Sequence, residues 1–129
     1  MEKNVFENIK DLDSTFLSTV YEDDAPTAVA IFEQYLQELP ADLYALYETF
    51  HQGDRETFRK LVHKKKVGFS YVGLTDVTAG LNELEHQCSL VTDINHLKPQ
   101  VDSIFERIHS STGSVRSVLL LLQQQLKDA

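Results

Sequence analysis

The sequence predicts an all-α protein: an antiparallel four-helix bundle with an additional N-terminal helix. Two observations support this prediction. The 129 residues include only five glycines and three prolines, which leaves few breakpoints for a fold of short strands and turns. Apolar residues recur at intervals of three and four through most of the chain, whereas no stretch alternates apolar and polar residues as a half-buried strand does.

The composition, 42% apolar and 25% charged, is typical of one folded domain of this length. We therefore expect a single domain over residues 1–129, with a helix over residues 1–20 and the bundle over residues 21–129. The single cysteine excludes an internal disulfide, and the N-terminus lacks the apolar stretch of a signal peptide. The most apolar run, residues 118 to 122, is far shorter than the roughly 20 residues of a membrane span. These features predict a cytoplasmic protein.

Two apolar stripes predict the first two helices. Residues 3 to 20 carry the first stripe: Val5, Ile9, Leu12, Phe16 and Val20. Asp24 is placed to cap the second helix, and Pro26 fits its first turn. The stripe of the second helix keeps one phase to His51 across Pro40, so we expect one helix that bends at the proline.

Glycine and capping residues bound the next two helices. Asp54 is expected to cap the third helix, which should run to about Val72. Gly73 ends it, and Thr75 is expected to cap a fourth helix over residues 76 to 88.

The last predicted helix is long. Its apolar residues hold one register from Val101 to Leu126, straight through the small polar residues 110 to 114. Composition alone would make residues 110 to 114 a linker, but the register predicts an unbroken helix with Pro99 in or near its first turn.

The charge of the chain is unevenly distributed. The formal net charge of −8 argues against nonspecific binding to nucleic acid or to an anionic membrane. Residues 55 to 66, however, hold six basic residues and one acid, Glu56, so this segment carries +5 and the other 117 residues carry −13. The six are Arg55, Arg59, Lys60, Lys64, Lys65 and Lys66. A charge run is most often a solvated helix face, but half of all the positive charge in twelve residues favours an anionic partner.

One histidine lies inside this basic segment and faces outward. On a helical wheel the buried side is formed by Phe58, Leu61, Val62, Phe69 and Val72. His63 lies about 140° from Phe58, with Arg59, Val67 and Ser70 beside it. Lys65 falls on the buried side, so we expect its stem to be covered and its ammonium to reach solvent. A neutral imidazole is a good nucleophile toward phosphoryl groups, and nearby lysines can offset the charge of the phosphoryl oxygens.

These residues resemble the motif of the histidine-containing phosphotransfer (HPt) domain family. The motif places a lysine three residues and a glycine ten residues after the histidine, as Lys66 and Gly73 follow His63. Further matches are Asp54 before the histidine, Leu84 and Glu85 on the following helix, and Phe32 and Pro40 on the preceding one. The resemblance covers residues 20 to 125. Two positions depart from it: Lys65 replaces a residue that is usually apolar, and Val67 one that is usually small.

The resemblance implies a phosphorelay intermediate. His63 would accept a phosphoryl group from the aspartyl phosphate of a receiver domain and pass it to another receiver aspartate. Lys66 would help hold the phosphoryl oxygens, and Glu85 would orient the imidazole or bound water. The implied partner-binding residues are Arg59, Lys64, Val67, Ser70 and Gly73, and Gly73 would also allow close packing or a turn below the site.

The resemblance also implies the partners and the cofactors. The partners would be response-regulator receiver domains and a hybrid histidine kinase. The chain would be a monomeric phosphocarrier and not an enzyme, because it has no ATP-binding or kinase motif. It would need no metal or other cofactor of its own, since the magnesium belongs to the partner receiver domain. Both a free-standing carrier and one domain of a larger hybrid kinase fit the sequence.

A non-catalytic helical docking module is the alternative. In that interpretation the leucine-rich residues 115 to 126 would bind a partner helix, without phosphate chemistry, although the same residues also fit the core of a bundle.

A di-iron bundle is a weaker alternative. Glu83-x-x-His86 and Glu106-x-x-His109 match its ligand pattern, but on the wheel both pairs point away from the apolar stripes. Cys88, by contrast, lies on an apolar stripe and is predicted to be core.

Overall fold

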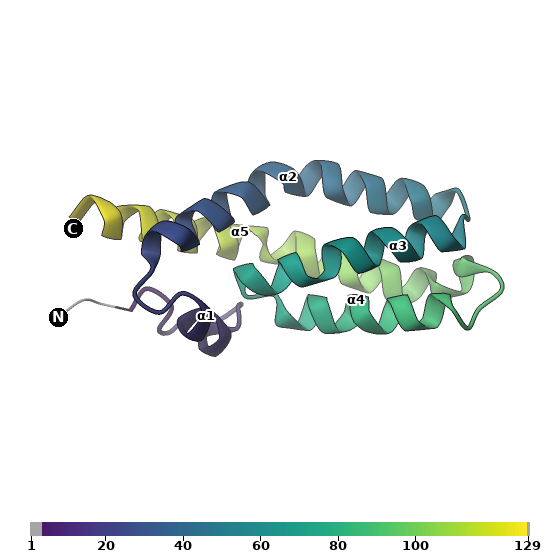
Figure 1. Cartoon of the computed structure of the whole chain (residues 1–129), viewed down its shortest axis with the longest axis horizontal. Helices are drawn as coiled ribbons and strands as arrows, with labels where there is room; N and C mark the ends of the chain where they lie inside the picture. The colour runs from purple at the N-terminus through teal and green to yellow at the C-terminus, as the bar shows by residue number, and fades with distance from the viewer. Residues whose placement is uncertain (1–3, 129) are drawn as a thin grey trace.

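The computed structural model describes residues 4 to 128, which are helical over most of their length and contain no strand (Figure 1). The α-helices are α1 (Ser14–Val20), α2 (Ala25–His51), α3 (Arg55–Lys65), α4 (Thr75–Cys88) and α5 (Lys98–Asp128). Two 3-10 helices, η1 (Lys66–Val72) and η2 (Ile94–Leu97), follow α3 and precede α5. The predicted all-α class is confirmed for these residues. The parts of the predicted N-terminal helix and single domain that fall on residues 1–3 and 129 lie outside the described residues.

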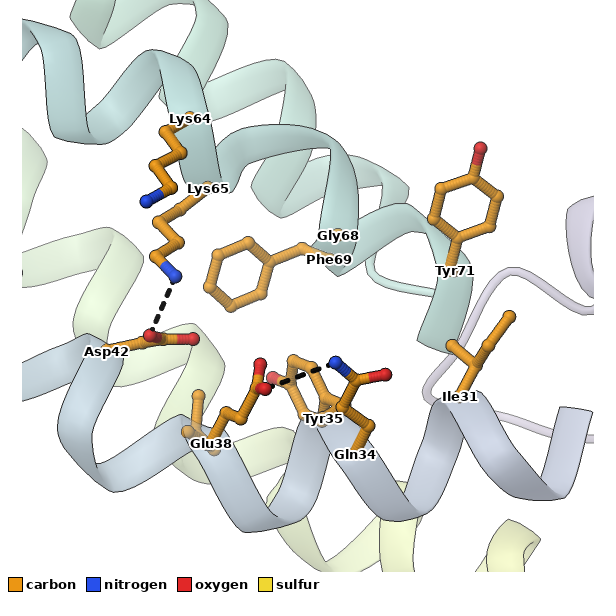
Figure 2. A pocket seen from close by; sticks show the side chains of 11 residues that line it. Ile31, Gln34, Tyr35, Glu38, Asp42, Lys64, Lys65, Gly68, Phe69 and Tyr71 are labelled. Carbon is orange, nitrogen blue, oxygen red and sulfur yellow. Dashed lines mark hydrogen bonds and ion pairs between the residues drawn. The ribbon is translucent and has the colours of Figure 1, made fainter.

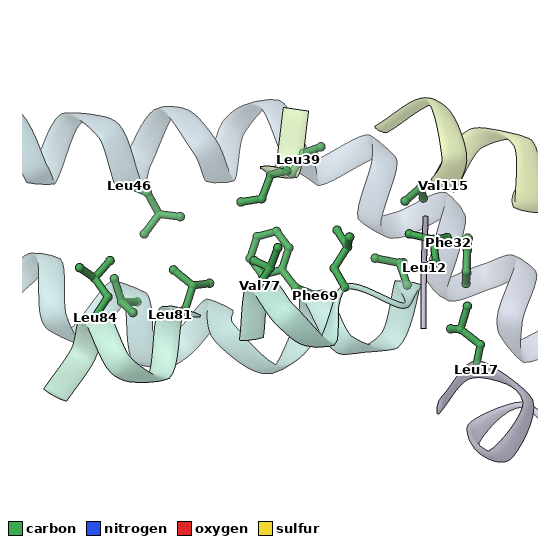
Figure 3. Packing of buried hydrophobic residues seen from close by; sticks show 14 of the residues in the cluster. Leu12, Leu17, Phe32, Leu39, Leu46, Phe69, Val77, Leu81, Leu84 and Val115 are labelled. Carbon is green, nitrogen blue, oxygen red and sulfur yellow. The ribbon is translucent and has the colours of Figure 1, made fainter. Parts of the chain in front are cut away.

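The four longer helices enclose one hydrophobic core. α2 packs against α3 and α5, and α4 packs against the same two helices. Successive long helices run in opposite directions along the molecule (Figure 1). Leu46 of α2 faces Leu81 and Leu84 of α4 across the core (Figure 3). Farther along α2, Leu39 faces Phe69 of η1 and Val77 of α4. Burying one such side chain stabilises the fold by about 2 kcal/mol.

α2 is one continuous helix, as predicted. Asp24 caps it by accepting a hydrogen bond from the Thr27 backbone amide, and a proline follows in the first turn. Pro40 lies inside the helix and has no amide hydrogen to donate to the carbonyl of Leu36. The helix changes direction partway along its length (Figure 1). The bend lets α2 follow the surface of the core instead of diverging from it.

The predicted N-terminal helix is wrong for most of its length. α1 begins only at Ser14, after Asp13, whose carboxylate accepts a hydrogen bond from the Phe16 backbone amide. Asn8 has a φ of 66°, which no right-handed helix contains. Side-chain bonds from Arg107 of α5 to the carboxylate and backbone carbonyl of Asp11, each 2.7 Å, hold this segment instead.

The predicted third helix changes type before it ends. α3 stops at Lys65, and residues 66 to 72 continue as η1. A 3-10 helix advances about 120° per residue instead of about 100°, so wheel positions drift progressively beyond Lys65. At Ser70 the error reaches roughly 100°, which turns this side chain from the surface toward α4.

Gly73 ends η1 in the left-handed conformation, with a φ of 88°. Its backbone carbonyl accepts a hydrogen bond of 2.8 Å from the Asp13 amide. Thr75 is the first residue of α4 and not its cap, because its hydroxyl is donated to the Asp13 carboxylate at 2.8 Å. The N-terminal segment thus closes over the turn between η1 and α4.

α5 is unbroken from Lys98 to Asp128, which confirms the prediction through residues 110 to 114 and places Pro99 in its first turn. Ser111 is buried there, and its hydroxyl is satisfied by the Ile108 carbonyl at 2.8 Å. None of the helices in the described residues combines the length and apolar character that crossing a lipid bilayer requires.

Replacing Gly73 with alanine should destabilise the protein by about 2 to 4 kcal/mol, from left-handed backbone strain plus overpacking. The new Cβ would lie 2.7 Å from Leu12 Cβ and 2.9 Å from Leu17 Cδ1. Gly53→Ala is the matched control, because its φ is 72° but nothing lies within 4 Å of an added Cβ. It should lose only about 1 to 2 kcal/mol. Urea unfolding measures the loss of stability in each variant. Equal losses in the two variants would contradict the packing role of Gly73.

Candidate functional site

Four polar side chains from α3, η1 and α4 form one hydrogen-bonded chain, which we call the His63 network. His63 Nδ1 lies 2.7 Å from Glu85 Oε1. Lys66 Nζ donates to Glu85 Oε2 at 2.7 Å and to Asn82 Oδ1 at 2.8 Å. Glu85 is therefore shared between the imidazole and the ammonium, one oxygen for each.

The register of two antiparallel helical segments assembles this network. His63 and Lys66 are three residues apart, as are Asn82 and Glu85, and side chains with this spacing lie on one face. A short turn joins the α3–η1 segment to α4, and the two run in opposite directions. The residue three positions after His63 therefore lies opposite the residue three positions before Glu85. His63 therefore meets Glu85, and Lys66 meets Asn82.

The side chains of the His63 network differ in their exposure to solvent. The His63 side chain is 66% exposed, whereas Glu85 and Lys66 are 15% and 18% exposed. A charge-assisted contact gains strength as water is excluded, so Glu85 and Lys66 form a fixed base under a ring that solvent and partners can reach.

The carboxylate of Glu85 is ionised at neutral pH. Partial burial raises the pKa of Glu85, but the hydrogen bonds from Lys66 and His63 and their positive charges outweigh it, and the net pKa is lowered. An ionised carboxylate can only accept, so the neutral His63 ring must carry its proton on Nδ1. The unprotonated nitrogen is then Nε2, which makes no hydrogen bond within residues 4 to 128.

Three of the five predicted partner-binding residues lie at the surface around His63. Lys64 is exposed, Val67 is 49% exposed and Arg59 is about one-third exposed. Arg59 pairs with Glu56 on its own helix, which holds its guanidinium along α3. These three side chains border the exposed imidazole.

The other two predicted partner-binding residues are not at the surface. Ser70 is only 8% exposed, and its hydroxyl donates to Thr78 of α4 at 2.7 Å. Thr78 in turn donates to the backbone carbonyl of Lys66 at 2.7 Å. Gly73 is buried beneath the N-terminal segment. Ser70 links η1, and hence Lys66, to α4, and Gly73 forms the turn between η1 and α4. Neither residue is placed at the surface, as the predicted contact role requires.

The basic segment is more neutralised than its formal +5 suggests. Three of its six basic side chains make ion pairs: Arg59 with Glu56, Lys65 with Asp42, and Lys66 with Glu85. Arg55 donates to a backbone carbonyl. Lys60 and Lys64, four residues apart on the exposed side of α3, make no ion pair among the residues described. They are the positive charges nearest His63 in sequence that a partner would meet unpaired.

Lys65 differs from its prediction. Its stem is partly covered, as expected, but its ammonium reaches Asp42 of α2 at 2.9 Å instead of open solvent. The acid on α2, 23 residues away in sequence, could not be assigned to this lysine from the pattern on one helix.

A groove between α2 and the α3–η1 segment runs beside the site (Figure 2). The Lys65–Asp42 ion pair spans it near Lys64. Phe69 and Tyr35 pack edge to face within it, with ring centroids 5.7 Å apart. The Tyr35 hydroxyl is buried without a hydrogen-bond partner in the described residues, and burial, with the nearby Asp42, raises its pKa. The groove thus has an apolar floor, and the Tyr35 hydroxyl is buried beside it without a hydrogen-bond partner in the described residues.

The remaining candidate residues lie away from this arrangement. The helical wheel predicts that Glu83, His86, Glu106 and His109 point away from the core. All four residues are exposed in the structure. Within residues 4 to 128 no group of three or more histidine, cysteine or acidic side chains is placed to hold a metal ion. Cys88 is buried, as predicted.

Comparisons with protein-family models, with curated proteins and with solved structures find no match to this chain. The resemblance to HPt domains therefore rests on the motif residues of the sequence alone.

Replacing Glu85 with glutamine should lower the free energy of unfolding by about 1.5 to 3 kcal/mol at pH 7, the scale of a hydrogen bond to a charged group. A carboxyl group whose pKa is lower in the folded protein stabilises it above the unfolded pKa, and this contribution is lost as the pH falls through the folded pKa. The difference between the two proteins should therefore shrink below pH 4.5, the ordinary glutamate value. Urea unfolding from pH 7 to 3 measures it. A difference independent of pH would show that Glu85 does not act through its charge.

Proposed function

We propose that this chain is an HPt-type phosphorelay protein, with its long helices in an antiparallel four-helix bundle. His63 would accept a phosphoryl group from the aspartyl phosphate of a receiver domain and donate it to another receiver aspartate. The observation that supports this most is the exposed imidazole with its Nδ1 bound to Glu85 at 2.7 Å. That contact leaves Nε2 as the free nucleophile on a convex surface.

The transfer would proceed by in-line attack. Nε2 of His63 forms a bond to phosphorus as the bond from phosphorus to the aspartate oxygen breaks, and the aspartate leaves as a carboxylate. The Nδ1 proton stays on the ring, so the phosphorylated imidazole is cationic and Glu85 stabilises it. Lys66 offsets the charge of the phosphoryl oxygens. The reverse reaction on a second receiver restores the neutral ring.

The docking face would include Arg59, Lys64 and Val67, together with the groove between α2 and the α3–η1 segment. The receiver would bring its acidic pocket and magnesium to the exposed ring. Lys60 and Lys64 would attract this acidic pocket. We further propose a cytoplasmic monomer that acts as a phosphocarrier, with a hybrid histidine kinase upstream.

A non-catalytic docking module is the second candidate. Leu120 and Leu121 of α5 are exposed and could contact a partner helix. Val115, Val118 and Leu122 of the same segment are buried, however, so only part of the leucine-rich run is free to contact a partner. This alternative also gives no role to the His63 network, and we therefore favour the phosphorelay.

The His63→Gln variant should accept no phosphoryl group from a phosphorylated receiver domain, because glutamine has no nucleophilic ring nitrogen. The wild-type protein should become labelled, and the label should survive alkali but not acid, as a phosphohistidine does. His109→Gln, a change of an exposed histidine on α5, should be labelled like the wild type. Label retained by His63→Gln would eliminate the phosphorelay assignment.

The Lys60→Gln, Lys64→Gln double variant should associate with a receiver domain several-fold more slowly at low salt. For the wild type, the association rate should fall as ionic strength rises, because exposed charges are screened within about 10 Å at 0.1 M salt. The variant should show a weaker salt dependence in stopped-flow measurements. Rates for the wild type that do not change with salt would exclude electrostatic steering.

A further inference from the structure

We propose that Asn82 is a positioning residue for phosphoryl transfer, which acts by holding the Lys66 ammonium in place beside His63. This inference rests on the proposed function. The side chain of Asn82 makes no hydrogen bond with His63. Its one hydrogen bond in the described residues is accepted by its side-chain oxygen from Lys66, at 2.8 Å. Nothing in the family resemblance assigns a role to this position.

The donor count of the ammonium explains why a second acceptor matters. A lysine ammonium has three N–H donors and no acceptor. Lys66 uses one on Glu85 Oε2 and one on Asn82 Oδ1, both on α4. The third has no partner in the described residues and is available to a phosphoryl oxygen. With two donors fixed to two acceptors one helical turn apart, the direction of the third is also set.

Without Asn82, a single contact to Glu85 would leave the ammonium free to rotate. A lysine side chain has about 2 kcal/mol of rotamer entropy, so one contact fixes it poorly. Electrostatic stabilisation of a transition state depends on donors that are already oriented when charge develops. Holding Lys66 before the reaction is the contribution we assign to Asn82.

The uncharged amide is suited to this task. A second carboxylate at this position would also hold Lys66, but it would cancel more of the ammonium charge and repel the phosphoryl oxygens. Asparagine holds the ammonium without adding negative charge. Because the ammonium only donates, the amide oxygen must face Lys66, which is the orientation that the structure shows.

The test is the rate of phosphoryl transfer from a phosphorylated receiver domain, measured as a function of receiver concentration. Asn82→Ala should lower the maximal rate about tenfold, the effect of one lost hydrogen bond that orients a charged group. The receiver concentration that gives half the maximal rate should not change, because Asn82 is not assigned to the docking face. Alanine is the stronger helix former, so the variant should fold.

A double-mutant cycle with Lys66→Met tests whether Asn82 acts through Lys66. In the Lys66→Met background, Asn82→Ala should produce no further loss. Gln87→Ala is the control, since it removes from the same helix an amide that donates to Glu83. This variant should transfer at the wild-type rate. Asn82→Asp should transfer slowly despite keeping an acceptor.

The outcomes separate this inference from the proposed function. A wild-type protein that takes no label would refute the phosphorelay itself. A labelled wild type with an Asn82→Ala variant of equal maximal rate would refute only the positioning role. Additive losses for Asn82→Ala and Lys66→Met would also refute it, and a fast Asn82→Asp variant would refute the need for an uncharged acceptor.

Discussion

The Glu85 carboxylate, shared between the His63 ring and the Lys66 ammonium, is the interaction on which the site depends. It joins α3 to α4 at the point where the ring is exposed. Its negative charge fixes the proton of the neutral ring on Nδ1 and so leaves Nε2 as the unprotonated nitrogen. The same charge is balanced by Lys66, so the carboxylate remains ionised although it is largely covered. Orientation, tautomer and charge at the site thus follow from one largely covered acceptor.

Residues outside the His63 network hold Glu85 in register with His63 and Lys66. Ser70 and Thr78 connect η1 to α4 just below Lys66. Gly73 lets the chain turn back tightly enough for α4 to lie alongside α3, and the N-terminal segment packs over that turn through Asp13. The change from α-helix to 3-10 helix after Lys65 is therefore part of the site, because it turns Ser70 inward. Ser70, which the helical wheel places at the surface, thus helps to position Lys66.

Local signals in the sequence predicted much of the fold. Asp24 and Asp54 act as helix caps because a short acidic side chain before an apolar stripe satisfies free amides, an effect that needs no distant partner. The register of α5 and the outward direction of His63 depend on helical periodicity alone, which is equally local. The irregular N-terminal segment was not predictable in this way, since its backbone is held by Arg107, nearly one hundred residues away. The contacts of Lys66 with Asn82 and of Lys65 with Asp42 were not predicted, for the same reason. In each contact the two residues lie on different helical elements, and only the packing of the helices brings their side chains together.

The central claim is that His63 carries its proton on Nδ1 and reacts through Nε2. Nitrogen-15 NMR of the histidine side chains tests it most directly, first on the free protein at neutral to mildly alkaline pH and then after phosphorylation. The account predicts that neutral His63 is the Nδ1–H tautomer and that phosphorus becomes coupled to Nε2. An Nε2–H tautomer in the free protein, or phosphorus bonded to Nδ1, would contradict it.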